Sequence, residues 1–165
     1  MKHYKYLLLL SILCSLVIFI DCGDEVDDSS ESLIYLDKNG ITIKAYENAV
    51  VGESYGLNGI NYLVVDSVMI YQSVDENEDL SKVFATKITR MLYLFSDSID
   101  HSFNQDIGSW DVGNVTDMSV IFFGASSFNQ DISAWEVSNV TECSAFRFNT
   151  TSWTELKPNF TNCTE

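Results

Sequence analysis

Residues 103–117 read FNQDIGSWDVGNVTD, and residues 128–142 read FNQDISAWEVSNVTE. Ten of these fifteen positions are identical, and the other five exchange one small residue for another or one acid for another. The chain therefore contains a tandem repeat with a period of 25 residues. A unit this short cannot close a hydrophobic core alone, so it must bury its apolar side against copies of itself.

A third, weaker copy precedes these two. Residues 88–95 (ITRMLYLF) align with residues 115–122 (VTDMSVIF), so the repeats run from about Thr86 to Trp153. In each copy we expect a turn that leads into a very short strand at Asn-Val-Thr. One apolar helical turn should follow, ended in one copy by Gly124. The pattern predicts an α/β repeat that stacks as about three 25-residue coils.

In such a stack, equivalent side chains of successive coils meet in apolar columns. Each fully buried aliphatic or aromatic side chain would contribute roughly 1.5–3 kcal/mol of transfer free energy before the entropy cost is subtracted. The predicted repeat core consists of Phe103, Trp110, Val112, Val115, Met118, Phe128, Trp135, Val137 and Val140.

Polar residues repeat with the same period. Asparagines at equivalent positions are expected to pair with backbone groups of the turns, and ligand contact is the alternative. The repeated asparagines are Asn104 with Asn129 and Asn114 with Asn139. The repeated acids are Asp106 with Asp131, Asp111 with Glu136, and Asp117 with Glu142. Rows of carboxylates could hold Ca²⁺, but the chain has no Asp-x-Asp-x-Asp-Gly loop, which favours a solvated acidic face. We predict no metal site and no cofactor.

The first 21 residues have the pattern of a secretory signal peptide. Lys2 and Lys5 precede an apolar run over residues 6–20, which is too short to span a bilayer comfortably. Residues 22–32 are acidic and serine-rich, with too little apolar surface to fold, and are expected to form a tether. The mature protein should therefore be exported.

The position of Cys22, between this signal and the tether, resembles the lipid attachment site of a bacterial lipoprotein. By that resemblance, Cys22 would carry the lipid that anchors the protein. Asp21 stands where such signals usually carry a small residue, so ordinary cleavage to a secreted form and an uncleaved anchor remain alternatives.

If Cys14 leaves with the signal and Cys22 is lipidated, the remaining cysteines are Cys143 and Cys163. An even pair in an oxidising compartment predicts a disulfide. Two reduced thiols or a metal pair is the alternative, which is weakened because no histidine stands nearby to complete a metal site.

Residues 33–80 are expected to form a small β capping unit that covers the first coil, and residues 81–165 the repeats with a C-terminal cap. Asn39-Gly40 and Asn58-Gly59 each separate two extended runs, which predicts two hairpins. Strand character continues through Val74.

The motif Phe-Asn-Gln-Asp-Ile-x-x-Trp-Asp/Glu-Val-x-Asn-Val-Thr, repeated every 25 residues, resembles the BspA-like leucine-rich-repeat surface proteins, which are also described as the DUF285 family. Residues 52–62 and 157–163 fit the flanks of that family. The resemblance implies a short leucine-rich-repeat-like solenoid with an N-terminal small β cap, located at the cell surface and mediating adhesion.

Charge restricts the partners. The whole chain carries a net charge of −15, and loss of residues 1–21 removes two lysines and one aspartate, which leaves −16. Nucleic acid and anionic lipid surfaces are therefore poor partners, and we expect contact with a membrane only through the lipid anchor. We expect no enzyme, because the mature chain has a single histidine, His101, and none of the common catalytic motifs.

The sequence thus predicts a lipid-anchored protein of the outer membrane or cell surface, or alternatively a secreted one. Its expected function is adhesion to, or binding of, a protein or glycan. The alternative is a structural surface protein without a dedicated ligand. Exposed aromatic side chains would favour binding, because aromatic anchors dominate interface energetics.

Overall fold

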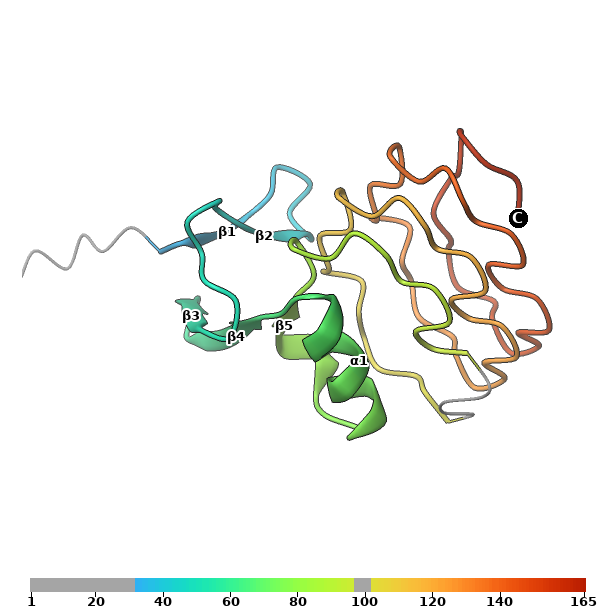
Figure 1. The fold of residues 1–165 in the computed structure, drawn as a ribbon, viewed down its shortest axis with the longest axis horizontal. Coiled ribbons are helices and arrows are strands. Elements are labelled where there is room, and N and C mark those ends of the chain that lie inside the picture. The colour runs from blue at the N-terminus through green and yellow to red at the C-terminus, as the bar shows by residue number, and fades with distance from the viewer. Residues whose placement is uncertain (1–31, 97–101) are drawn as a thin grey trace, which may run out of the picture. The chain divides into compact units, whose positions relative to one another are not determined.

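The computed structural model describes residues 32–96 and 102–165. The predicted signal peptide, nearly all of the tether, Cys22 and His101 lie outside the described residues. The regular elements occur in the order β1 (Ile34–Leu36), β2 (Ile43–Ala45), β3 (Ser54–Leu57), β4 (Ile60–Val64), α1 (Ser67–Asp75), the 3-10 helix η1 (Leu80–Lys82) and β5 (Val83–Phe84) (Figure 1). Strands β1 and β2 form one sheet, and a second sheet has the order β3-β4-β5.

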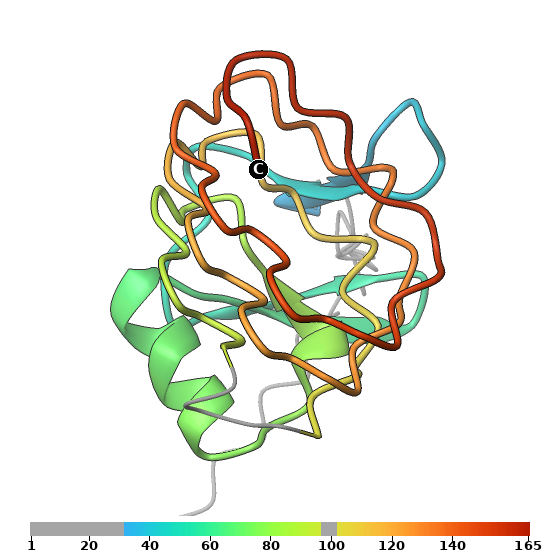
Figure 2. The same cartoon turned by 90° about the vertical axis from the view of Figure 1, so that its right-hand side faces the viewer.

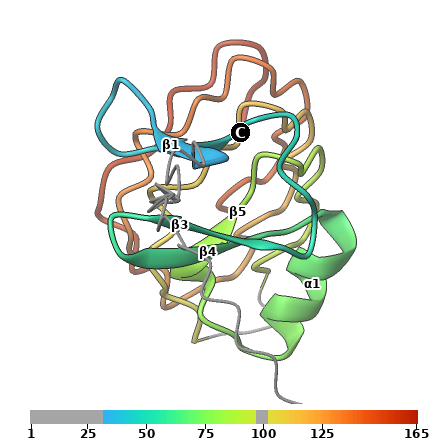
Figure 3. The same ribbon diagram turned by 90° about the vertical axis from the view of Figure 1, so that its left-hand side faces the viewer.

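Both predicted hairpins are confirmed. β1 pairs antiparallel with β2 and β3 pairs antiparallel with β4, around Asn39-Gly40 and Asn58-Gly59. Gly40 and Gly59 have φ angles of 71° and 80°, which glycine adopts without the steric cost that a Cβ atom would bring. Figure 3 shows these strands on the side facing the viewer. β5 joins β4 in parallel and closes the second sheet.

The prediction of strand character through Val74 is wrong for residues 67–74, which lie in α1. The side chain of Asp66 accepts hydrogen bonds from the backbone N–H groups of Val68 and Met69, each at 2.9 Å, and so caps the helix. Ile70 and Val74 are four residues apart, and both are buried on the same helix face. A capping aspartate and this spacing outweigh the local β propensity.

The expected fold class, an α/β repeat forming a leucine-rich-repeat-like solenoid, is wrong. The described part of the chain holds small antiparallel and mixed sheets with one α-helix, and all these elements precede residue 85. Among the described residues after β5 there is no further helix or strand. The only β pairing there consists of single parallel bridges, from Arg90 to Asp117 and from Asp117 to Glu142. In Figure 1 the successive repeats lie side by side, and in Figure 2 they follow one another's outline as irregular loops.

The expected helical turn ended by Gly124 is also absent, and the hydrogen bonds explain why. Residues 91–96, 118–124 and 143–149, here called the turn segments, occupy equivalent positions in the three repeats. The N–H groups of Val120 and Gly124 donate to Ser144 and Phe148 in the next turn segment, rather than to carbonyls four residues earlier. Val120 and Gly124 have φ angles of 53° and 71°, which no α-helix contains.

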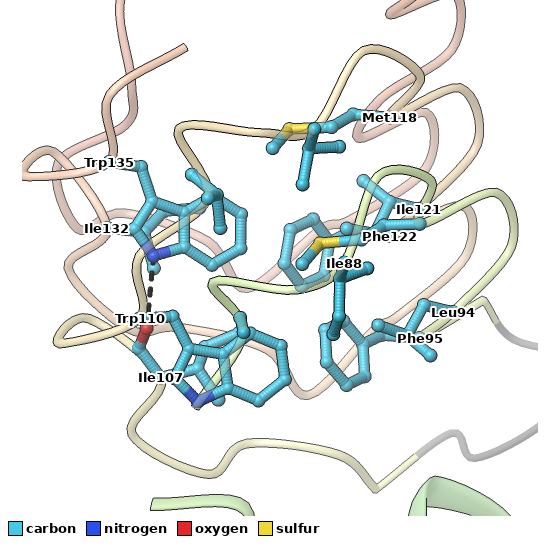
Figure 4. Packing of buried hydrophobic residues seen from close by; sticks show 14 of the residues in the cluster. Ile88, Leu94, Phe95, Ile107, Trp110, Met118, Ile121, Phe122, Ile132 and Trp135 are labelled. Atoms are coloured by element: carbon cyan, nitrogen blue, oxygen red, sulfur yellow. Dashed lines mark hydrogen bonds between the residues drawn. The ribbon is translucent and has the colours of Figure 1, made fainter. Parts of the chain in front are cut away.

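The main core lies within the repeats. All nine residues of the predicted repeat core are buried, and all belong to one hydrophobic cluster (Figure 4). The Trp110 and Trp135 rings are parallel within 8°, with centroids 6.4 Å apart, and Phe103 and Phe128 are parallel within 3° at 5.8 Å. The core also contains a set of buried residues that were not predicted, among them Leu94, Phe95, Ile107, Ile121, Phe122, Ile132 and Phe146. A smaller cluster around Ile34, Tyr62 and Phe84 lies between the two sheets.

Candidate binding surface

The tryptophans of the repeats satisfy their one polar atom inside the core. The indole N–H of Trp110 donates to the carbonyl of Leu80 at 3.0 Å, that of Trp135 to Ile107 at 3.0 Å, and that of Trp153 to Gln130 at 3.1 Å. Figure 4 shows the second of these bonds. Since a buried indole needs such a partner, these bonds fix the register of each repeat against the preceding chain.

The repeated asparagines bond to backbone groups of the adjacent repeat, as the turn-pairing interpretation expected. The amide of Asn114 donates to the carbonyl of Thr86 at 2.8 Å, and that of Asn139 donates to Gly113 at 2.7 Å. The side-chain oxygen of Asn104 accepts from the backbone N–H of Asn129 at 2.8 Å. These asparagines therefore hold the repeats together.

The acidic rows are used for turns. The carboxylates of Asp106, Asp111, Asp117, Asp131 and Glu136 each accept from a backbone N–H two residues further along the chain. Hydrogen bonds from the backbone and side chain of Ser133 lower the pKa of Asp131. Burial alone would raise the pKa of Asp117, but hydrogen bonds from Ser119 and Arg90 lower it overall. In residues 32–96 and 102–165, no three His, Cys, Asp or Glu side chains are grouped to hold a metal ion.

A disulfide joins Cys143 and Cys163, the two cysteines that the sequence analysis paired. It holds the end of the described chain against the third turn segment. Phe160 packs edge-on against Phe146 with ring centroids 4.9 Å apart. The guanidinium of Arg147 donates to the carboxylate of Glu165 at 2.6 Å.

Three aromatic side chains of the turn segments are exposed, Tyr93, Phe123 and Phe148, and the last two stand at equivalent positions of neighbouring repeats. Phe123 is 39% exposed and Phe148 is 63% exposed, and their rings stack with centroids 5.4 Å apart at 17°. A cavity of about 310 Å³ adjoins them and is lined by residues 145–149 and Glu165. We call Phe123, Phe148, Arg147 and this cavity the aromatic surface. It places apolar rings, a guanidinium and a carboxylate side by side.

Phe123 and Phe148 are separated by one period of 25 residues, but neither they nor Arg147 were among the predicted site residues. A signal was present, because Phe122 and Phe123 are consecutive and the chain can turn only one of them into the core. Phe122 is fully buried and Phe123 is not. Which of the two faces outward depends on the φ angle of Val120, which the sequence does not reveal.

Residues 66–164 match the family model described as "Mycoplasma protein of unknown function, DUF285". The match covers more than half of the chain, and the protein belongs to this family. No curated protein and no solved structure showed significant similarity to the chain. Among the described residues, no helix combines the length and apolar character that crossing a membrane requires.

Proposed function

We propose that this protein is an exported binding module that is anchored at the cell surface through a lipid on Cys22 and contacts a protein or glycan through the aromatic surface. The observation that carries the proposal is the stacked pair Phe123 and Phe148. Exposed rings that stack on each other beside a cavity cost free energy in water, and they regain it when a partner covers them. The resemblance in sequence to BspA-like surface proteins supports adhesion as the biological use.

Charge supports a neutral or cationic partner. The mature chain, with a net charge of −16, repels polyanions. Basic proteins and uncharged glycans are not repelled electrostatically. The proposal involves no catalytic step and no cofactor. The membrane is contacted only through the lipid, at the head of an acidic tether.

The alternative is a structural surface protein without a ligand, and one observation favours it. Every aromatic side chain in the predicted repeat core is buried, so most of the aromatic content serves packing. The two functions differ at Phe123 and Phe148, because packing alone gives no reason for two stacked rings in solvent.

Binding of the purified mature protein to a protein and glycan array tests the proposal. We expect saturable binding that is lost when Phe123→Ser and Phe148→Ser are combined. The matched control is Val68→Ser, which removes an apolar side chain that is 75% exposed on α1, outside the aromatic surface. Absence of binding across the array would support the structural alternative, and equal binding by both variants would show that the ligand binds outside the aromatic surface.

The anchor is tested separately by mass spectrometry of the mature protein from its native cells. We expect a chain that starts at Cys22 and carries the mass of a diacylglycerol group. An unmodified chain would remove the lipid anchor from the proposal but leave the aromatic surface intact.

A further inference from the structure

The bonds that N–H groups of a turn segment make to another repeat all go to the following repeat, to its turn segment or to the acidic residue just before it. Just before the turn segments the direction is reversed, because the N–H groups of Thr116 and Thr141 donate to Thr89 and Thr116 of the preceding repeat. N–H groups at every second position of one turn segment donate to carbonyl groups of the next repeat. In the first pair of segments, Met91, Tyr93 and Phe95 donate to Asp117, Ser119 and Ile121. In the second pair, Met118, Val120, Phe122 and Gly124 donate to Glu142, Ser144, Phe146 and Phe148, over distances of 2.8, 2.9, 2.9 and 2.8 Å. Each segment therefore presents an acceptor edge to the preceding repeat and a donor edge to the following one.

The acceptor edge of the first turn segment is covered by the chain itself. The hydroxyl of Tyr71 on α1 donates to the carbonyl of Leu92 at 2.6 Å. Ile70 and Val74 of the same helix belong to the repeat core. The helix thus occupies the side of the first repeat on which a preceding repeat would pack.

The donor edge of the third turn segment is open. The equivalent N–H groups belong to Cys143, Ala145, Arg147 and Asn149, and in the described part of the chain none of these four makes a hydrogen bond. Ala145 and Asn149 have φ angles of 52° and 63°, close to those of Val120 and Gly124 at the equivalent positions. The backbone therefore holds these donors as it does in the inner segment. We call residues 143–149 the open edge.

The open edge carries a charged side chain where the inner segments carry a buried ring. Arg147 stands where Phe95 and Phe122 stand in the first and second turn segments. Those two rings stack within the core, with centroids 5.4 Å apart, whereas Arg147 is exposed and bonded to the carboxylate of Glu165. A partner's side chain that lies over Arg147 would contact a guanidinium that already binds the carboxylate of Glu165.

We propose that the open edge binds an extended polypeptide segment of a partner protein, whose main-chain carbonyls accept hydrogen bonds from the four N–H groups and which sets an acidic side chain against Arg147. The proposal rests on the proposed binding function and names the class of partner. Two equivalent interfaces inside the molecule already hold polypeptide in this way, with three and four such bonds, and the open edge continues them. Backbone pairing to an unpaired edge is a recurrent mode of peptide recognition.

A second copy of the chain does not fit the same edge. Two donor edges that face each other offer no acceptors. The acceptor edge of another copy lies at its first turn segment, which α1 covers. The cavity of about 310 Å³ lies along residues 145–149, and Phe148 is exposed beside it. It therefore suits an extended segment of a partner protein rather than a second copy of this chain.

A fluorescent peptide with the sequence of residues 117–124, carrying Phe122→Glu and a soluble tail, is the probe. A second peptide carries Phe122→Lys at the same position. We expect the glutamate peptide to bind the full chain about tenfold more tightly than the lysine peptide in an anisotropy titration, since a charge pair at partial exposure is worth on the order of 1 kcal/mol. Arg147→Glu should reverse this preference, and Val68→Ser should leave it unchanged.

An extended chain tests the backbone part of the proposal. Residues 162–165 (NCTE) repeat residues 139–142 (NVTE), and the amide of Asn162 donates to Ser138 as that of Asn139 does to Gly113. Adding Met-Ser-Val-Ile-Phe-Phe-Gly after Glu165 should therefore supply the next turn segment in cis and abolish peptide binding.

Failure of the glutamate peptide to bind the unextended chain, or unchanged binding after the extension, would overturn the inference. The proposed function is tested independently by the array. If array binding persists without peptide binding, only the polypeptide docking is wrong. If both are lost, the binding function itself is wrong.

Discussion

The backbone N–H and C=O groups find their hydrogen-bond partners at different distances along the chain in two regions. These are the sheet region, residues 32–84, and the repeat region, residues 86–165. In the sheet region most partners are close in sequence, as in the hairpin that pairs Leu57 with Ile60. In the repeat region they lie about 25 residues apart, as when Met118 donates to Glu142. A hairpin can therefore form from its own residues, whereas a repeat has partners only when its neighbour is in place.

The two regions also differ in their cores. The cluster between the sheets is small and contains one fully enclosed ring, that of Phe84. The repeat core contains stacked rings from each repeat, and it extends to Ile70 and Val74 of α1. The destabilisation caused by truncating one core side chain should therefore reach more of the surrounding structure in the repeats than between the sheets.

The largest effect is expected from Trp135→Ala. The side chain is 3% exposed, and its indole N–H is the partner of the Ile107 carbonyl, so the variant loses buried surface and a hydrogen bond together. We expect the free energy of unfolding to fall by about 3–5 kcal/mol, as for other buried Trp-to-Ala changes. Chemical denaturation followed by circular dichroism measures it.

Ile34→Ala in the smaller cluster is the matched comparison for this prediction. We expect it to cost about 2–3 kcal/mol, toward the low end for such changes, because its cluster is small. A loss for Trp135→Ala that is smaller than the loss for Ile34→Ala would contradict the difference between the two cores.

An intermediate loss of stability is expected from replacing either of two asparagines whose side-chain oxygens each accept hydrogen bonds from backbone N–H groups. The side-chain oxygen of Asn39 accepts from Ile41 and Thr42 within the first hairpin, and that of Asn129 accepts from Thr154 and Glu155 in the next repeat. Asn129→Ala should lower the free energy of unfolding by about 1–2 kcal/mol, since three hydrogen bonds between repeats are lost, two from backbone N–H groups and one from the Thr154 hydroxyl.

Asn39→Ala should act mainly on its own turn. Native-state amide exchange separates the two cases, because it reports opening at each backbone N–H. We expect faster exchange only near residues 41–45 for Asn39→Ala, and across the last repeat for Asn129→Ala. Equal, local effects of both variants would show that the repeats do not depend on each other.

The smallest effect is expected on the way in which stability falls as the pH is lowered. The pKa of Asp117 is lowered in the folded protein from its ordinary value of 3.8, although burial opposes the hydrogen bonds that lower it. The folded state therefore binds fewer protons than the unfolded state. The stabilisation is complete above the ordinary value and is lost as the pH falls through the folded value.

Asp117→Asn should therefore flatten the loss of stability from about pH 5 to about pH 2, measured by denaturation at each pH. The pKa of Asp37 in the sheet region is also lowered, by hydrogen bonds from Lys38 and Lys44, but its side chain is 28% exposed, against 16% for Asp117. Asp37→Asn should change the pH profile less. A larger change for Asp37→Asn would place the acid sensitivity in the sheet region instead.

Much of this organisation was visible in local patterns. Asn-Gly pairs between extended runs predicted both hairpins, since few residues tolerate the φ angles that such turns require. The identical positions in the repeats identified Trp110 and Trp135 as core, because only equivalent packing preserves large side chains at a fixed period. The helix α1 was missed, because its β-branched and aromatic residues have strand propensity and only the capping bonds of Asp66 reveal it.

The repeat period, the apolar core positions and the acidic charge follow from the order of residues alone, because a recurring side chain must meet a recurring environment. The conformation of the turn segments, the outward direction of Phe123 and the donor edge at residues 143–149 were decided only by the tertiary structure. Their backbone groups bond to neighbours about 25 residues away, and no local pattern encodes a partner at that distance.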